Sequence, residues 1–248
     1  PGATLAAIRA AVPPHLYFAP DPTETSASIG GMISCNSSGA LSFLHGPTRN
    51  HALGLRVALA SGEVLDLRRG RDRARGLHFA LGAVAGELPP LRRPVVKNAA
   101  GYFVDPDMDL VDLFIGAEGT LGVVTAATLR LLPAPGAVWG LMAFLPSTPA
   151  VVGFVNDLRT KQRSGLESPD ESTPPTANDQ PPTLAPRLAA LEYFDARALA
   201  FLREHADELA SKDIPVPNIP DGDACVYAEG HAPDAAAAEA AVLAAAER

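Results

Sequence analysis

Cysteine is nearly missing from this sequence, and its scarcity excludes several kinds of protein. Cys35 and Cys225 lie far apart and form no C-x-x-C pair, so neither a disulfide scaffold nor a zinc site is supported. The six histidines follow no H-E-x-x-H pattern, and no metal site is predicted. A reducing compartment follows as the default. We therefore expect a cytoplasmic protein, either free or peripheral to the membrane.

Positive charge and long apolar runs are also in short supply. The formal net charge of −8 argues against a nucleic-acid partner, since such proteins need clustered positive surface to displace counterions from phosphates. The one basic run, 68–75, lacks interleaved aromatics and is interpreted as a solvated loop. No apolar run approaches the roughly 20 residues of a transmembrane helix. The hydrophobic content of 47% nevertheless supports a packed core.

The first half of the chain shows two clear structural patterns. Apolar residues at Leu5, Ile8 and Val12 predict a helix with Thr4 as its N-cap. Residues 53–67 alternate on either side of Ser61-Gly62 and predict a β-hairpin. The remaining predictions here are a surface connection over 68–93, a short helix or turn ending at Leu113, a glycine-rich loop over 116–122, and a strand from Val123.

A second domain is predicted after 133–136, which reads P-A-P-G. Strands are expected at 138–145, 188–194 and 224–229, alternating with helices at 150–158, 196–210 and 233–248. This order resembles a split βαβ, ferredoxin-like unit that is short of its last strand. Residues 161–186 are rich in Pro, Ser, Thr and Asp, and we expect a disordered insertion there. The predicted domains are 1–135 and 136–248.

Three side-chain-poor clusters are candidates for binding. The first contains Pro20-Asp21-Pro22, Ser28-Ile29-Gly30-Gly31 and Asn36-x-x-Gly39. Glycine turns let backbone N–H groups approach a ligand and form an anion-binding concavity. A pyrophosphate or the edge of a flat heteroaromatic ring would suit it, and two ordinary tight turns are the alternative.

The second cluster is E-G-T-L-G-V-V-T, from Glu118 to Thr125. Its glycines would bring main chain close to a ligand, and Glu118 could accept a hydrogen bond from a ribose hydroxyl. A plain loop-to-strand turn with a solvated glutamate is the alternative. The pattern matches neither the dinucleotide G-x-G-x-x-G nor a Walker A loop, which disfavours a nicotinamide-type Rossmann site.

The third cluster is Lys97-Asn98-Ala99-Ala100-Gly101-Tyr102. It could line a pocket for an anionic substrate. Equally, Lys97 could be a surface cation and Tyr102 a packed ring. No serine–histidine–acid arrangement is recognisable. The aspartates at 105, 107, 109 and 112 lack the glycine and distal glutamate of a calcium loop.

Taken in order, the clusters resemble the FAD-binding domain of the vanillyl-alcohol-oxidase, or PCMH-type, flavoproteins, in the branch that contains D-lactate dehydrogenase and glycolate oxidase. The residues that carry the resemblance lie before about Pro135 and read L-Y-F-A-P-D-P, S-I-G-G-M-I-S-C-N-S-S-G, H-G-P-T-R-N-H-A-L-G-L-R-V-A-L-A-S-G-E-V-L, V-K-N-A-A-G-Y and D-L-F-I-G-A-E-G-T-L-G-V-V-T-A-A-T-L-R-L-L-P. From Val138 onward the chain resembles the cap domain of that branch.

The resemblance implies an α+β fold, with the C-terminal subdomain of a PCMH-type FAD-binding domain followed by a partial ferredoxin-like cap domain. It implies FAD as the cofactor. The cofactor-binding residues that it implies are Asp21, Pro22, Ser28, Ile29, Gly30, Gly31, Asn36, Gly39, Gly46, Glu118, Gly119, Gly122, Val123, Val124 and Thr125. Lys97 and Asn98 would lie nearer the flavin and the substrate.

The implied activity is oxidation of a D-2-hydroxy acid by hydride transfer to flavin N5, with a quinone, cytochrome or iron–sulfur protein as electron acceptor. A flavin-dependent transferase resembling alkylglycerone-phosphate synthase and a non-catalytic module are the alternatives. The family's R-G-x-G-T-type loop and H-x-G-D-G-N-x-H-like segment are not found in this sequence, which begins with Pro1. We therefore expect a fragment that binds FAD weakly or not at all and is inactive alone.

Overall fold

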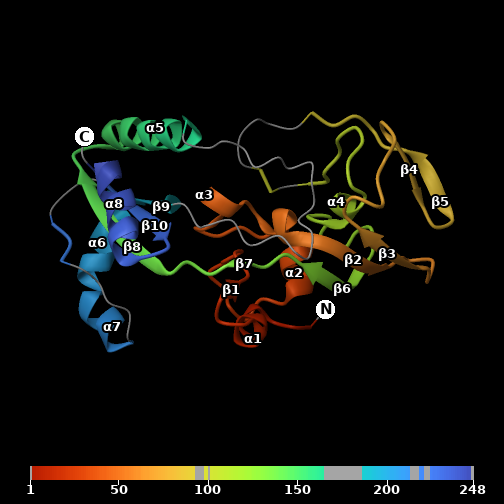
Figure 1. Cartoon of the computed structure of the whole chain (residues 1–248), viewed down its shortest axis with the longest axis horizontal. Helices are drawn as coiled ribbons and strands as arrows, with labels where there is room; N and C mark the ends of the chain where they lie inside the picture. The colour runs from red at the N-terminus through yellow and green to blue at the C-terminus, as the bar shows by residue number, and fades with distance from the viewer. Residues whose placement is uncertain are drawn as a thin grey trace. The chain divides into compact units, whose positions relative to one another are not determined.

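The computed structural model describes residues 2–92, 98–99, 101–164, 186–212, 218–220 and 224–246. The chain divides into two compact units, Pro1–Ala134 and Pro135–Arg248 (Figure 1). Both units mix helices and strands, as the α+β prediction requires. No helix in the described ranges is long and apolar enough to cross a membrane.

The first unit opens with the predicted helix, α1 (Leu5–Ala11). The Oγ1 of Thr4 accepts a hydrogen bond from the backbone N–H of Ala7 at 3.1 Å, so the predicted N-cap is confirmed. Leu5 is fully buried, and Ile8 packs against the same core. The short strand β1 (Leu16–Tyr17) follows and pairs antiparallel with β7 (Leu132–Pro133).

A three-stranded antiparallel sheet forms the centre of the first unit. Its strands are β2 (Ala52–Ala58), β3 (Val64–Arg68) and β6 (Val123–Leu129), in the order β3-β2-β6. The predicted hairpin is therefore confirmed, with Leu55, Val57, Leu65 and Leu67 buried. The strand predicted from Val123 is also confirmed. Short helices around the sheet are α2 (Ile29–Ser34), α3 (Ser42–His45), η1 (Thr48–His51) and α4 (Val111–Phe114).

The prediction of turns around Gly30 and Gly31 is wrong, because both residues lie in helix α2. Neither glycine has a positive φ. The helix forms because Ser28 caps it, its Oγ accepting from the backbone N–H of Gly31 at 3.1 Å. Met32 and Ile33 are then buried in the core of the unit. Tertiary packing outweighs the low helix propensity of the two glycines here.

The segment 68–93 is also more ordered than expected. It contains a second hairpin, β4 (His78–Leu81) and β5 (Val84–Glu87). Nor is its basic run simply a solvated loop, because the guanidinium of Arg69 forms ion pairs with Asp109 at 3.4 Å and Asp112 at 2.8 Å. Arg71 remains exposed, as predicted.

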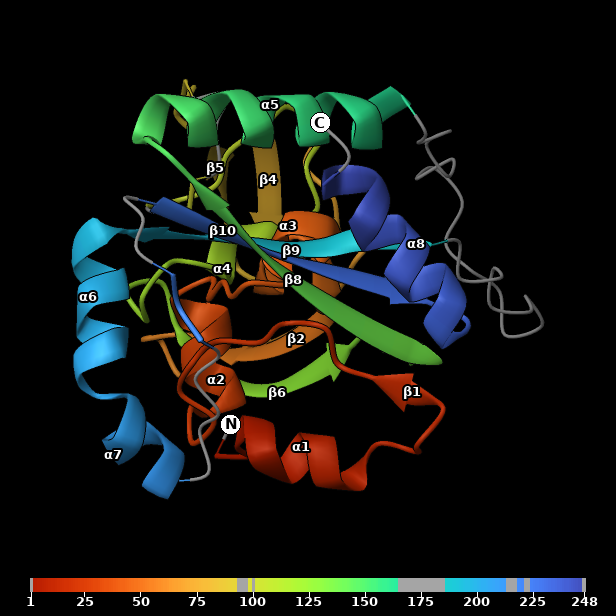
Figure 2. The same ribbon diagram turned by 90° about the vertical axis from the view of Figure 1, so that its left-hand side faces the viewer.

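The second unit is built on a three-stranded sheet in which β10 lies between β8 and β9 (Figure 2). Its elements are β8 (Ala137–Leu145), α5 (Thr148–Ser164), β9 (Arg187–Asp195), α6 (Ala196–Glu204), α7 (Ala206–Ser211), β10 (Ala224–Ala232) and α8 (Ala235–Ala246). Strand β10 is antiparallel to both neighbours. Strands β8 and β9 are therefore parallel and joined through α5, which confirms the split βαβ order.

Two predicted boundaries in this unit are wrong. Helix α5 continues to Ser164, so residues 161–164 of the expected insertion are helical. The rest of that expected insertion, 165–185, lies outside the described residues. The helix expected over 196–210 is two helices that meet at His205.

Candidate functional site

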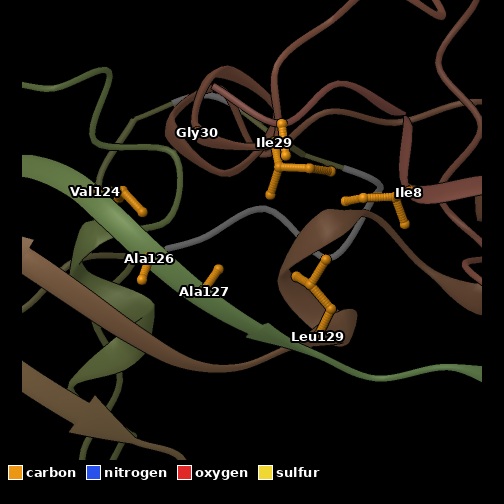
Figure 3. Close-up of a pocket in the computed structure, with 8 residues that line it drawn as sticks. Ile8, Ile29, Gly30, Val124, Ala126, Ala127 and Leu129 are labelled. Carbon is orange, nitrogen blue, oxygen red and sulfur yellow. The ribbon is translucent and has the colours of Figure 1, made fainter. Parts of the chain in front are cut away.

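A cavity of about 120 Å³ lies beside α2 and β6 in the first unit (Figure 3). It brings together Ile29 and Gly30 from the first predicted cluster and Val124 from the second. Ile29 and Val124 are buried, and the walls are apolar. Complete small-molecule sites usually enclose roughly 300–1,000 Å³. A cavity of this size can therefore hold only a part of a ligand as large as FAD.

Sequence reasoning missed five other residues that line this cavity: Ala3, Ile8, Ala126, Ala127 and Leu129. Ile8 was assigned only to the core face of its helix. The residues on β6 continue the strand beyond the predicted cluster, which ended at Thr125. Small alanines at successive strand positions were the available signal, because they leave space beside a sheet.

The second cluster forms a loop that is hydrogen-bonded to the end of α2. The backbone N–H of Gly116 donates to the carbonyl oxygen of Ile33 at 3.0 Å, and that of Glu118 donates to Ser34 at 2.9 Å. Glu118 and Gly119 have φ values of 51° and 77°. A Cβ added at Gly119 would meet no atom within 4 Å. The loop thus leaves its backbone uncovered at Gly119, within the described part of the chain.

The third cluster reaches the second one through Tyr102. The Oη of Tyr102 lies 2.7 Å from the Oγ1 of Thr120. Tyr102 is 46% exposed, so the interpretation of Tyr102 as a packed ring is wrong. Asn98 is exposed too, whereas Lys97 lies outside the described residues.

The other residues of the first cluster are joined to one another by the protein's own contacts. The backbone N–H of Leu41 donates a hydrogen bond that both carboxylate oxygens of Asp21 share, at 3.1 and 3.2 Å. A Cβ at Gly39 would lie 2.2 Å from the carbonyl oxygen of Asp21. The side chain of Asn36, which is buried, accepts from the backbone N–H of Arg49 at 3.0 Å. These contacts explain the small residues here without any ligand.

The remaining predicted residues occupy simple positions. Gly46 ends α3 with a φ of 75° beside Asn50, and Pro22 lies in the loop that follows β1. A Cβ at Gly122 would lie 2.7 Å from the side chain of Val57, so glycine permits close approach to β2 there. Val123 is 63% exposed, and the hydroxyl of Thr125 donates to the carbonyl oxygen of Arg56 at 3.1 Å.

An ion-pair network that the sequence analysis did not predict contacts the residues that precede the loop of the second cluster. Arg49 lies 3.0 Å from the carboxylate of Asp112 and also donates to the carbonyl oxygen of Ile115. Its guanidinium stacks 4.3 Å from the centre of the Phe103 ring. Arg69 pairs with the same aspartate, and hydrogen bonds to Asp112 raise the pKa of Arg69 despite its burial. Asp109 and Asp112 thus form ion pairs with arginines. No metal-binding group of His, Cys, Asp or Glu occurs among the residues described.

Comparison with known proteins finds relatives that cover much of the chain. Residues 1–68 match the family model described as FAD binding domain. The chain is 36% identical to glycolate oxidase subunit GlcD of Bacillus subtilis over 156 residues, which cover 62% of this chain and 27% of that protein. It is 33% identical to a D-lactate dehydrogenase of Archaeoglobus fulgidus, covering 48% and 20%.

A longer match covers most of the chain. D-2-hydroxyglutarate dehydrogenase of Stutzerimonas stutzeri is 28% identical over 203 residues, or 82% of this chain and 31% of that protein. Among solved structures, one of alkyldihydroxyacetonephosphate synthase matches 94% of this chain and 35% of its own, with a TM-score of 0.55 and 15% identity. That likeness shows a shared fold. The chain spans less than a third of the length of these three curated relatives.

Two segments far apart in sequence enclose this apolar space, and an apolar wall without charged groups is compatible with one part of a flavin cofactor. The matched domain identifies FAD as the cofactor. The matched domain and the glycolate oxidase and D-lactate dehydrogenase relatives are thus consistent with a fragment of a PCMH-type FAD-binding flavoprotein.

Proposed function

We propose that this chain is part of an FAD-linked oxidoreductase that oxidises a D-2-hydroxy acid of the lactate or glycolate type. The observation that carries the proposal is the cavity shared by Ile29, Gly30 and Val124. The names of the relatives support the substrate class, since all three curated relatives described above act on small hydroxy acids by name.

In this proposal, the first unit contributes one wall of the cofactor site. Ile29 and Val124 exclude water, and Gly30 keeps the wall free of a side chain. Backbone groups at Glu118 and Gly119 face the nucleotide. The other members of the predicted set, from Asp21 to Gly46 and from Gly122 to Thr125, hold these segments in place. A bound FAD would supply the hydride acceptor for oxidation at the carbon that bears the substrate hydroxyl.

The substrate side of the site is assigned to Lys97 and Asn98, which would orient an anionic acid. No residue is assigned as the base that takes the hydroxyl proton. A quinone, a cytochrome or an iron–sulfur protein would accept the electrons. Residues 1–135 would be the partial FAD-binding domain and 136–248 the partial cap domain. We expect the 248 residues alone to bind FAD weakly or not at all and to show no turnover.

The transferase alternative is retained as an outcome of the tests. Its support is the structural match to alkyldihydroxyacetonephosphate synthase, which at 15% identity concerns the fold. Sequence identity of 33–36% with the glycolate oxidase and D-lactate dehydrogenase relatives favours oxidation. A non-catalytic module would bind no flavin nucleotide.

The cofactor site is tested by titrating the chain with FAD up to millimolar concentration. Gly30→Val should abolish the binding because it places a branched side chain against the nucleotide, and Gly119→Val should abolish it because valine is also strained at the φ of 77° found there. Arg71→Ala, at an exposed arginine, is the control and should bind like wild type. Hydrogen exchange in residues 53–67 reports that the hairpin remains folded. Unchanged FAD affinity in both glycine variants would refute the site.

The reaction is tested on the protein encoded by the full natural reading frame, with D-lactate, glycolate and D-2-hydroxyglutarate as substrates and a redox dye as acceptor. Dye reduction supports the oxidoreductase. Flavin binding without dye reduction by any of these acids would favour the transferase instead. Isolation of the 248-residue chain with stoichiometric flavin would contradict the expected weak binding.

A further inference from the structure

Tyr102 is exposed, yet its hydroxyl has a defined role in a hydrogen-bond relay. The Oγ1 of Thr120 donates to the carbonyl oxygen of Ala117 at 2.6 Å, and the Oη of Tyr102 lies 2.7 Å from the same Oγ1. A threonine hydroxyl has a single hydrogen. Since that hydrogen is used by Ala117, Tyr102 must be the donor and Thr120 the acceptor.

The relay acts on the loop that exposes Gly119. Glu118 has a φ of 51°, a left-handed conformation that is unfavourable for a residue with a side chain and persists where the surroundings enforce it. The start of the loop is attached to α2 through the backbone N–H groups of Gly116 and Glu118. Thr120, two residues further on, closes the turn by donating its backbone N–H to the carbonyl oxygen of Ala117 at 3.0 Å, and its hydroxyl accepts from Tyr102. The left-handed pair Glu118-Gly119 is therefore held from both sides.

The core of the unit offers no explanation for the tyrosine. Tyr102 is 46% exposed, and a Cβ at the adjacent Gly101 would meet no atom within 4 Å. Among the residues described, the hydrogen bond to Thr120 attaches Tyr102 to the loop.

We propose that Tyr102 is a positioning residue of the nucleotide site, acting through Thr120. By donating to Thr120, it holds the backbone of 118–120 in the conformation that meets the nucleotide part of FAD. This inference rests on the proposed FAD site. It connects the third predicted cluster with the second and gives Tyr102 a role distinct from substrate binding.

A double-mutant cycle in the 248-residue chain tests the inference. Tyr102→Phe keeps the ring and removes the donor, and Thr120→Val removes the acceptor. Each should weaken FAD binding about threefold to tenfold, as expected for one hydrogen bond. The double variant should be no weaker than Thr120→Val, because both changes break the same relay. Thr120→Ser, which keeps the hydroxyl, should retain wild-type affinity. Amide hydrogen exchange at 118–122 should be faster in Tyr102→Phe than in the wild-type chain, even without FAD.

Tyr193→Phe is a matched control. Tyr193 is similarly exposed, at 47%, and its hydroxyl lies 3.2 Å from that of Thr148 in the second unit. This variant should bind FAD like wild type, and an equal loss would show a non-specific effect and overturn the inference. So would wild-type affinity in Tyr102→Phe, or losses in the two variants that add together. If FAD binds the wild-type chain at millimolar concentration but protects no amide of 118–122, the inference fails together with the proposed nucleotide site.

Discussion

Arg69 forms a bidentate ion pair with Asp112 through both terminal nitrogens of its guanidinium group. The Nη1 donates to Oδ2 at 2.8 Å and the Nη2 to Oδ1 at 2.9 Å. The aspartate side chain is 7% exposed and also accepts from Arg49 at 3.0 Å. One carboxylate thus pairs with two arginines and connects the turn after β3 with η1 and α4. Bidentate pairs of this kind combine strength with a fixed geometry.

Asp112→Asn should strongly destabilise the first unit. The variant leaves two partly buried arginines without their shared counter-charge, and breaking such a pair from one side costs about 3–5 kcal/mol. Urea unfolding followed by circular dichroism measures the loss. Asp66→Asn is the control, because Asp66 is 66% exposed and its arginine contacts are 3.8 and 3.9 Å long. A surface pair of that kind contributes little, so equal effects of the two variants would contradict the assignment.

Gly39→Ala should also destabilise the first unit, by about 1–3 kcal/mol. The new Cβ would lie 2.2 Å from the carbonyl oxygen of Asp21, which is main chain and cannot move aside easily. Gly153→Ala provides the opposite case. Gly153 lies within α5 with no atom within 4 Å of an added Cβ. This change should stabilise the second unit by about 0.5–1 kcal/mol. Thermal unfolding should show a lower melting temperature for Gly39→Ala and a higher one for Gly153→Ala. An unchanged melting temperature in Gly39→Ala would contradict the close contact between Gly39 and Asp21.

The second unit should lose stability in acid through Glu229. The imidazole of His231 lies 2.8 Å from one carboxylate oxygen of Glu229, and the hydroxyl of Tyr227 donates to the other at 2.7 Å. The hydrogen bond from His231 lowers the pKa of Glu229 below its ordinary value of 4.5. Since the folded-state pKa is depressed, the stabilisation is fully present above pH 4.5 and is lost as pH falls through the lower folded value.

Trp139, the single tryptophan, lies on β8 and reports on this unit. The urea concentration at the unfolding midpoint, followed by Trp139 fluorescence, should decrease as the pH is lowered from 5 to 3, a range around the ordinary glutamate pKa. Glu229→Gln should reduce that decrease. Glu208→Gln removes an exposed carboxylate that pairs with Lys212, and it should leave the slope unchanged. An unaltered slope in Glu229→Gln would show that other groups govern the acid response.

The first unit should weaken at mildly acidic pH because of His51. Burial lowers the pKa of His51 below its ordinary 6.5, and the ring nitrogen Nε2 lies 3.0 Å from the carbonyl oxygen of His45. A depressed folded-state pKa means that stability is complete above pH 6.5 and declines as pH falls through the folded value. His51→Gln should reduce the decline between about pH 7 and pH 5. His78→Gln, at an exposed histidine, should not.

How much of the site was predictable differs between its parts. The segments that carry Ile29, Gly30 and Val124 could be named from their order along the chain, and the structure brings them to one cavity. Their local geometry could not, because Gly30 and Gly31 favour turns by themselves. The cap at Ser28 together with burial of Met32 and Ile33 in a shared core makes a helix the more stable choice.

The sequence by itself determined those elements whose stabilising contacts are local. Thr4 begins a helix because its own hydroxyl caps it, and the hairpin around Ser61-Gly62 follows from alternation on either side of a turn. Tertiary structure alone decided that Arg69 is held by Asp112 and that Tyr102 reaches Thr120. These pairs lie 43 and 18 residues apart. Such contacts depend on how distant segments pack, which a local pattern does not encode.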